Sequence, residues 1–189
     1  WTYENGNIDE GVEFSVVCAP EGYTYVPDDN FEQALVDLGY DSVVDDFVLT
    51  ENISGVTSLD VSEKEISDLT GIEDFMALTD LLCGNNQLTA LDVSTNTALT
   101  MLVCNENQLT ALDLSANTAL DYLNCDSNQL TDLDVSANTA LTYFSCYSNQ
   151  LTSLDLSVNT ALTELRCYSN QLTALDVSNN TALTHLQCN

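Results

Sequence analysis

The sequence has 189 residues, of which 44% are hydrophobic, and this is enough for one domain with a sizeable buried core. Acidic residues number 30 and the net charge is −28, with Lys64 and Arg166 as the only permanent cations. Two cations cannot follow a phosphate backbone, which excludes nucleic acid as a ligand and makes an anionic membrane a poor partner. The sequence contains no apolar run of about 18 residues, so no segment is expected to span a bilayer.

The first segment, residues 1–26, is predicted to be a leader or the tail of a preceding domain. One run in it, Val12–Val17, has the composition of a strand. The sequence has neither an initiator methionine nor a basic and apolar signal segment. We therefore expect a mature protein or a piece of a longer one.

Residues 27–55 are predicted to form a helical N-terminal cap. Asp29 or Asn30 can cap the helix, and Gly39 is expected to end it. Its apolar stripe consists of Phe31, Leu35 and Leu38. Because an exposed first repeat would leave core side chains and a strand edge open, we expect this helix to cover it.

Residues 56–189 are predicted to form a repeat solenoid that stops partway through a repeat. A unit of 21 residues recurs from Leu78, and a looser copy of 22 residues precedes it at Val56. In this copy Val56, Leu59 and Val61 take the places of Leu78, Leu81 and Cys83. The clearest units are LTMLVCNENQLTALDLSANTA, LDYLNCDSNQLTDLDVSANTA and LTYFSCYSNQLTSLDLSVNTA.

These units match the LxxLxLxxNxL pattern of leucine-rich repeats, with cysteine at the third apolar position. The repeat resembles the short bacterial leucine-rich repeat class with nested 21-residue units and, more distantly, the internalins. The resemblance implies a parallel solenoid of stacked coils, one coil per repeat. The segment VPDDNFEQALVDLGYD is similar to segments that precede such repeats in secreted and surface proteins of Gram-negative bacteria, which implies export.

Alternation of apolar residues places Leu78, Leu81 and Cys83 inward on a first strand of each coil. Leu88, Leu91 and Val93 have the same parity, so we expect a second inward-facing strand and two parallel sheets with little helix. Two rows of asparagine are expected to satisfy buried backbone groups at the turns. These rows are Asn86, Asn107, Asn128, Asn149 and Asn170, and Asn96, Asn117, Asn138, Asn159 and Asn180.

Six cysteines lie 21 residues apart, and all six are expected to point into the core as reduced thiols. A bridge between Cys18 and a neighbour stays open because the count of seven is odd. A regular row offers no tetrahedral cluster for zinc, so no metal site is predicted there. The only histidine, His185, is expected to point outward while Cys188 points inward, which excludes a cysteine and histidine pair.

Aspartates form an outward row on the second half of the coils, and we call it the Asp ladder. Its members are Asp92, Asp113, Asp134, Asp155 and Asp176. Hydrogen bonds from nearby serines and turn amides, or hard cations, would relieve the repulsion between these stacked charges. We expect no cofactor, and weakly bound Ca²⁺ along this ladder remains an alternative.

The outward positions of the first strand change from coil to coil, whereas those of the second half hardly change. This contrast predicts that the first strand carries a binding surface, with tyrosines and one arginine as anchors. Cross-strand packing of the tyrosines and pairing of Arg166 with Glu164 are the alternatives without a ligand. The predicted ligand-binding residues are Met101, Tyr122, Tyr143, Tyr147, Glu164, Arg166, Tyr168 and His185.

The sequence therefore predicts a non-enzymatic extracellular or cell-surface module for recognition or adhesion, with a protein as its partner. It shows no pocket motif, positioned base or cofactor motif for an enzyme. A carbohydrate-binding module and a structural spacer of a larger surface protein are the alternatives. The open strand edge at the C-terminal end predicts edge-to-edge self-association.

Overall fold

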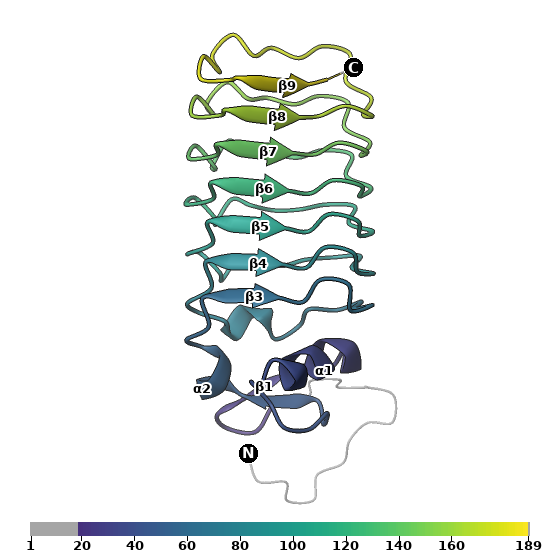
Figure 1. Cartoon of the computed structure of the whole chain (residues 1–189), viewed down its shortest axis with the longest axis vertical. Coiled ribbons are helices and arrows are strands. Elements are labelled where there is room, and N and C mark those ends of the chain that lie inside the picture. The colour runs from purple at the N-terminus through teal and green to yellow at the C-terminus, as the bar shows by residue number, and fades with distance from the viewer. Residues whose placement is uncertain (1–18, 189) are drawn as a thin grey trace, which may run out of the picture.

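The computed structural model describes residues 19–188, which form an N-terminal cap followed by a solenoid (Figure 1). Seven short strands stack in sequence order into one parallel sheet. The strands are β3 (Ser58–Asp60), β4 (Asp80–Leu82), β5 (Met101–Val103), β6 (Tyr122–Asn124), β7 (Tyr143–Ser145), β8 (Glu164–Arg166) and β9 (His185–Gln187). This arrangement confirms the predicted parallel solenoid.

The register of the sheet follows the repeat. Leu81 pairs with Leu102, and Leu102 pairs with Leu123, so each residue lies beside its equivalent in the next coil. Leu59 pairs with Leu81, which confirms that the looser copy at Val56 forms the first coil. Equivalent side chains therefore form rows at the strand spacing of about 4.8 Å.

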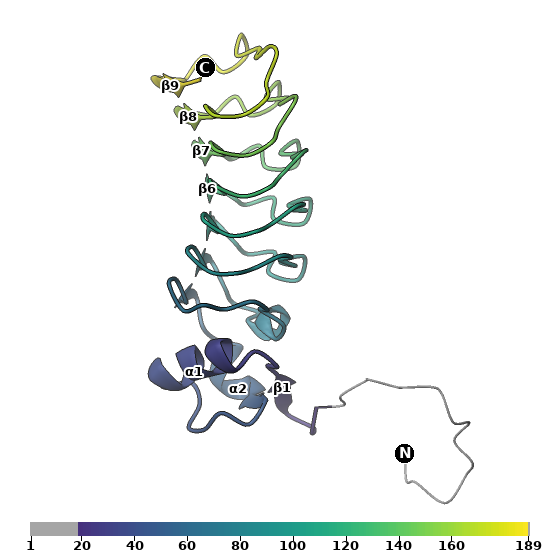
Figure 2. The same cartoon turned by 90° about the vertical axis from the view of Figure 1, so that its right-hand side faces the viewer.

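The prediction of a second parallel sheet is wrong. The second half of each coil consists of turns and irregular backbone, as the loops opposite the strands show in Figure 2. Where this half begins, one backbone hydrogen bond joins neighbouring coils, from the Gln108 N–H to the Leu88 carbonyl. The neighbouring Leu88 N–H instead donates to Oδ1 of Asn107 at 2.9 Å. Because a side chain takes the place of the strand partner, the ladder of backbone bonds cannot continue.

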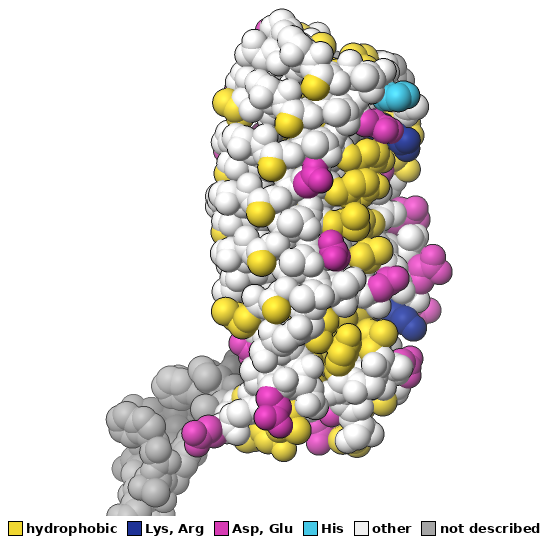
Figure 3. Space-filling view, turned by 60° about the vertical axis from the view of Figure 1, so that its left-hand side comes forward, with side chains coloured by type: hydrophobic (Ala, Val, Ile, Leu, Met, Phe, Trp, Pro, Cys, Tyr) yellow, Lys and Arg dark blue, Asp and Glu magenta, His cyan; other side chains and the backbone are white. Residues whose placement is uncertain are grey.

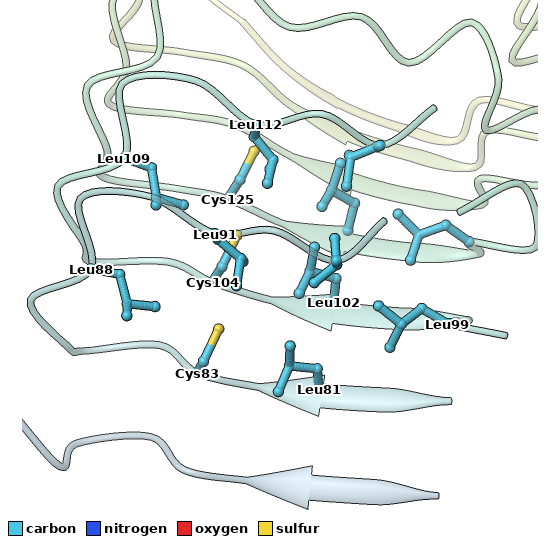
Figure 4. Packing of buried hydrophobic residues seen from close by; sticks show 14 of the residues in the cluster. Leu81, Cys83, Leu88, Leu91, Leu99, Leu102, Cys104, Leu109, Leu112 and Cys125 are labelled. Carbon is cyan, nitrogen blue, oxygen red and sulfur yellow. The ribbon is translucent and has the colours of Figure 1, made fainter. Parts of the chain in front are cut away.

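The core lies between the sheet and the irregular half of each coil. Leu81 and Cys83 point inward from the first strand, and Leu88 and Leu91 point toward them from the other side (Figure 4). All four are buried, so the inward parity predicted for both halves is confirmed. Burial of a leucine side chain contributes about 1.5 to 3 kcal/mol, which makes this core the main source of stability.

Both rows of asparagine satisfy backbone groups, as predicted. Asn107 donates to the carbonyls of Cys83 and Cys104 while its Oδ1 accepts from Leu88, so one amide joins two coils. In the second row, Asn117 donates to the carbonyls of Val93 and Asn96 in the preceding coil. These amides replace regular secondary structure at the two turns of each coil.

The cap contains helix α1 (Asp29–Asp37), the short helix α2 (Thr50–Ile53) and a hairpin of β1 (Tyr23–Tyr25) with β2 (Phe47–Leu49). Figure 1 shows α1 and this hairpin below β3. This is the end of the solenoid that the predicted helix was expected to cover. β1 falls within the segment that the sequence suggested was a leader. A 3₁₀ turn, η1 (Ile72–Asp74), adds to the first coil.

Two details of the predicted helix are wrong. Its N-cap is Asp28 and not Asp29 or Asn30, because the Asp28 carboxylate accepts from the N–H groups of Asn30 and Phe31. Leu38 lies after the helix and is 46% exposed, whereas Ala34 joins Phe31 and Leu35 in the core. Gly39 follows at φ 83°, a left-handed conformation that suits glycine and ends the helix.

Two carboxylates fasten the cap. The second oxygen of Asp28 accepts from the hydroxyl and N–H of Ser67 and the N–H of Asp68, which lie in the first coil. Glu32 is fully buried and accepts from the N–H groups of Asp45, Asp46 and Phe47. The cap is therefore joined to the solenoid by hydrogen bonds as well as by apolar contact.

The cysteine row agrees with expectation except at its end. Cys83, Cys104, Cys125, Cys146 and Cys167 are buried free thiols, whereas Cys188 is free and exposed. The prediction that Cys188 lies in the core is wrong, because in the described structure no coil packs over β9 and the thiol is exposed. Cys18 and the strand-like run Val12–Val17 lie outside the described residues.

Candidate functional site

The outward side chains of the first strands form one continuous surface, which we call the first-strand face. It has three columns with one residue per coil in each; the strand register aligns the first two, and the third lies two residues further along, just after the strands end. Column one is Asp80, Met101, Tyr122, Tyr143, Glu164 and His185. Column two is Leu82, Val103, Asn124, Ser145, Arg166 and Gln187, and column three is Gly84, Asn105, Asp126, Tyr147 and Tyr168.

Figure 3 shows hydrophobic and aromatic side chains as a band over the strands, with acidic groups on both sides. Glu106 and Asp121 are exposed beside this band. The surface is therefore apolar along its middle and negative at its margins.

Four tyrosines form two stacked pairs within the face. The rings of Tyr122 and Tyr143 have centroids 4.2 Å apart and an angle of 2° between their planes. The rings of Tyr147 and Tyr168 lie 4.6 Å apart at 6°. Parallel strands in register place Tyr122 and Tyr143 side by side, and Tyr147 and Tyr168 stack in the same way just beyond the strand ends. All four side chains are half-buried.

Arg166 lies beside the first tyrosine pair. Its guanidinium donates to Oε1 of Glu164 through Nε at 2.8 Å and approaches the same oxygen through Nη2 at 2.7 Å. The guanidinium carbon also lies 5.7 Å from the centre of the Tyr143 ring. The hydrogen bond to Glu164 raises the pKa of Arg166. The ion pair between Arg166 and Glu164, which the sequence left open as an alternative to ligand binding, is therefore present on the face.

Asp126 is a member of the face that the sequence did not single out. Its side chain is 4% exposed, and Oδ1 accepts from the Ser145 hydroxyl at 2.6 Å and from the Tyr147 N–H at 2.9 Å. Burial raises the pKa of Asp126 to about 6, although the bonds from Ser145 and Tyr147 and the charge of Arg166 act in the opposite direction. The sequence could have pointed to Asp126 through one feature, because it is the one acidic residue in a column of glycine, asparagine and tyrosine.

The structure places all eight predicted residues on the first-strand face. The four tyrosines, Glu164 and Arg166 gather on three neighbouring coils, and Met101 is the strand partner of Tyr122. His185 is the partner of Glu164 at the next strand, where it is exposed and its Nδ1 lies 2.9 Å from the Thr184 hydroxyl. The tyrosine cluster is thus the centre of the set, and His185 lies at its end.

The Asp ladder has a structural arrangement. Each carboxylate accepts from the N–H of the serine two residues later, as Asp134 does from Ser136 at 2.8 Å. Hydrogen bonds from these serines hold the pKa of each ladder aspartate below its usual value. Within residues 19–188 no group of three or more histidine, cysteine or carboxylate side chains is arranged to hold a metal ion.

The buried cysteines are poorly suited to nucleophilic chemistry. Burial raises the pKa of Cys104 to about 12 and that of Cys167 to about 11. Burial also raises the pKa of Cys83, Cys125 and Cys146. Because the thiolate is the reactive form, these side chains act as small apolar groups of the core.

Comparison with known proteins gives an internalin-like leucine-rich repeat. The chain is 47% identical over 73 residues to Internalin J of Listeria monocytogenes, a match that spans 39% of this chain and 8% of that protein. A solved structure of the functional domain of InlJ from Listeria monocytogenes, described as including a cysteine ladder, has 40% identity and a TM-score of 0.73. That similarity covers 88% of this chain and 43% of the other.

A leucine-rich repeat protein of Leptospira interrogans is similar at 25% identity with a TM-score of 0.65, covering 70% of this chain and 37% of that one. No family model matches the sequence. The chain thus spans less than half the length of these relatives. The leucine-rich repeat fold and the resemblance to internalins stated from the sequence are both confirmed.

Proposed function

We propose that the chain is a non-enzymatic, extracellular recognition module that binds a protein partner through the first-strand face. The observation that carries this proposal is the distribution of change among the coils. Core leucines, cysteines and asparagines repeat from coil to coil, whereas the three columns of the face differ at nearly every coil. A scaffold that keeps its core and individualises one surface is typical of repeat proteins that bind partners.

The chemistry of the face supports a protein as the partner. Tyrosine and arginine are the residues that most often anchor protein interfaces, because they combine large contact area with polar tips. The tyrosine pairs, Arg166 and the half-buried Met101 lie next to one another over four coils. The similarity to the functional domain of InlJ supports the same type of module.

The ring geometry makes carbohydrate a weaker candidate. A sugar stacks on an aromatic ring through the open face of that ring. Here Tyr143 is covered by Tyr122 on one face and approached by Arg166, and Tyr147 stacks against Tyr168. Stacking thus removes one face of each ring from contact with a sugar, whereas tyrosine edges and hydroxyls suit hydrogen bonds and side-chain contacts of a protein surface.

The charge of the chain favours a partner with a basic patch. With a net charge of −28, the molecule would attract a cationic surface and increase the rate of encounter with it. The described residues contain no helix that is long and apolar enough to cross a membrane. Acidic composition and the resemblance of the cap segment to exported proteins support the extracellular location.

The test is binding of the chain to an array of purified extracellular proteins and to an array of glycans. A variant with Tyr143, Tyr147 and Tyr168 changed to alanine is compared with the wild type on every array. The matched control changes three exposed glutamines, one on each of the three coils that carry the tyrosine cluster, and these are Gln129→Ala, Gln150→Ala and Gln171→Ala. We expect protein binding that the tyrosine variant loses and the glutamine variant keeps, with equal melting temperatures.

Three outcomes would contradict the proposal. Binding that survives the tyrosine substitutions would remove the first-strand face. Binding to glycans alone, unchanged by salt, would indicate the carbohydrate alternative, because a basic protein partner should bind more weakly at high ionic strength. A chain that binds nothing would be a spacer.

A further inference from the structure

Asp126 occupies an unusual position on the first-strand face. It lies in column three between Asn105 and Tyr147, and it is 4% exposed although its column faces outward. The other carboxylates at the margins of the face, Glu106 and Asp121, are exposed. Carboxylates are seldom buried unless a cation or several hydrogen bonds compensate for lost hydration.

Hydrogen bonding compensates on one side of this carboxylate. Oδ1 accepts both bonds, from the Ser145 hydroxyl and the Tyr147 N–H, and both donors belong to the next coil. The N–H of Asp126 donates to Oδ1 of Asn124 at 3.1 Å, which fixes the backbone at this residue. The position of the carboxylate is therefore set by the fold before any partner arrives.

The cations of the chain are engaged elsewhere. In the described part of the structure the ion pairs are Arg166 with Glu164 and Lys64 with Asp37. Arg166 is near enough to lower the pKa of Asp126, but its guanidinium hydrogen bonds to Glu164. Asp126 thus carries a nearly buried negative charge whose neighbouring cation is held by another carboxylate.

The tyrosines and cysteines around Asp126 remain neutral under ordinary conditions. Burial raises the pKa of Tyr122 to about 12 and also raises that of Tyr147. Behind the carboxylate lie the buried thiols of Cys104, Cys125 and Cys146, whose pKa values burial raises as well. Glu106 lies beside Asp126 on the preceding coil, where its N–H donates to the Asp126 carbonyl at 2.9 Å, and Arg166 is the positive group that acts on the Asp126 carboxylate.

We propose that Asp126 is the anchor for a cationic side chain, an arginine or a lysine, of the protein that binds the first-strand face. This inference rests on the proposed function and names the contact that would give it specificity. Tyr122 and Tyr147 lie near enough to Asp126 for its charge to raise their pKa values, and their rings would receive the aliphatic stem of the incoming side chain. A desolvated ion pair of this kind discriminates strongly between a cation and any other side chain.

Affinity should depend on pH in a manner specific to Asp126. Its pKa of about 6 implies that the carboxylate loses its charge as the pH falls through this value, whereas ordinary carboxylates do so near pH 4. Binding of a cation should weaken over the same range. Histidines generally change charge between about pH 5 and 8, so His185→Gln is introduced into every protein compared.

The experiment uses a displayed library of random peptides as the probe. Peptides are selected on the chain at about pH 7.5, and those that also bind the variant with Tyr143, Tyr147 and Tyr168 changed to alanine are discarded. Individual peptides are then synthesised, and their dissociation constants are measured at about pH 5 and about pH 7.5. Each is measured with the otherwise wild-type chain that carries His185→Gln, and with Asp126→Asn and Glu106→Gln added to it, the latter as a control that removes one exposed charge near the same face.

Asp126→Asn is a suitable variant because the asparagine Oδ1 can still accept from Ser145 and Tyr147, so the loop is kept while the charge is removed. We expect the selected peptides to share an arginine or lysine and to lose affinity by at least about tenfold with this variant at neutral pH. The weakening of binding in acid should disappear in the same variant. Glu106→Gln should change affinity by less than about threefold.

The outcomes separate this inference from the proposed function. Peptides that depend on the tyrosines but bind Asp126→Asn as tightly as the wild type would overturn the role of Asp126 alone. So would a dependence on pH that persists in Asp126→Asn. If no peptide depends on the tyrosines, the binding face itself is wrong, and the inference is wrong with it.

Discussion

At the scale of single residues, the asparagines of the first row carry more of the structure than their polarity suggests. Asn128 donates to the carbonyls of Cys104 and Cys125, and its Oδ1 accepts from the Leu109 N–H. All of these groups are buried, so no solvent can replace the amide if it is removed. A buried donor or acceptor that loses its partner costs about 1 to 3 kcal/mol.

We expect Asn128→Ala to lower the free energy of unfolding by more than about 3 kcal/mol, since several buried groups lose partners at once. Chemical denaturation followed by circular dichroism measures this change. Gln129→Ala serves as the control, because that side chain is exposed and adjacent in sequence. Equal losses in the two variants would contradict the role assigned to the asparagine row.

Asp28 provides a prediction that depends on pH. Burial acts to raise its pKa, but the hydrogen bonds from Ser67, Phe31 and Asp68 outweigh burial and hold the pKa below its usual value. A carboxylate whose pKa is lowered by folding stabilises the folded state above its unfolded pKa, and this stability is lost as the pH falls through the folded pKa. The contribution should therefore be complete at neutral pH and disappear in the acid range below about pH 4.

We expect Asp28→Ala to lower the melting temperature at neutral pH and to make the difference from the wild type shrink in acid. The loss of an N-cap alone costs about 1 kcal/mol, and the contacts with the first coil add to it. Thermal melts across this pH range provide the measurement, with Asp29→Ala as the exposed neighbour for comparison. A difference that does not change with pH would show that the charge of Asp28 is not involved.

At the scale of elements, the sequence predicted the first strands, the inward leucines and cysteines and both asparagine rows, because a strict 21-residue period fixes all of them together. The second sheet failed because periodicity reports which side chains are buried and not which backbone groups pair. Asn107 takes the N–H that a strand partner would need, and no pattern of apolar residues reveals that substitution.

The cap shows a similar limit. Three polar residues in succession, Asp28, Asp29 and Asn30, could each cap α1, and Asp28 is the one whose carboxylate also accepts from Ser67 in the first coil. Asp126 was missed for the same reason, since its burial depends on Ser145 and Tyr147 of the next coil. The choice of N-cap and the burial of Asp126 both depend on contacts with a coil that is distant in sequence, and local sequence does not reveal such contacts.

At the scale of the whole molecule, charge opposes compaction. A net charge of −28 on 189 residues produces self-repulsion that dissolved salt screens over about 10 Å at about 0.1 M. The Asp ladder concentrates part of this charge in one row, with Asp132, Asp134 and Asp155 lining the same shallow hollow. Calcium along this row remains a prediction.

We expect the melting temperature to rise with sodium chloride, and to rise further with calcium chloride at equal ionic strength if calcium bridges the ladder. Replacing Asp134 and Asp155 with asparagine should remove the extra effect of calcium and leave the effect of sodium in place. Calorimetric melts at matched ionic strength measure both. Equal curves for the two salts would reject calcium bridging.

Self-association through the edge of β9 is a separate prediction that sedimentation tests.

The row of buried thiols provides each coil with a reporter of its own opening. Cys83, Cys104, Cys125, Cys146 and Cys167 are chemically alike and buried in equivalent places, one coil apart. An alkylating reagent can reach each thiol only when its coil opens, so labelling rates convert into local opening free energies. Mass spectrometry of the labelled chain would thus map the cooperativity of the solenoid along its axis without any engineered probe. Uniform rates would indicate that the coils open as one unit.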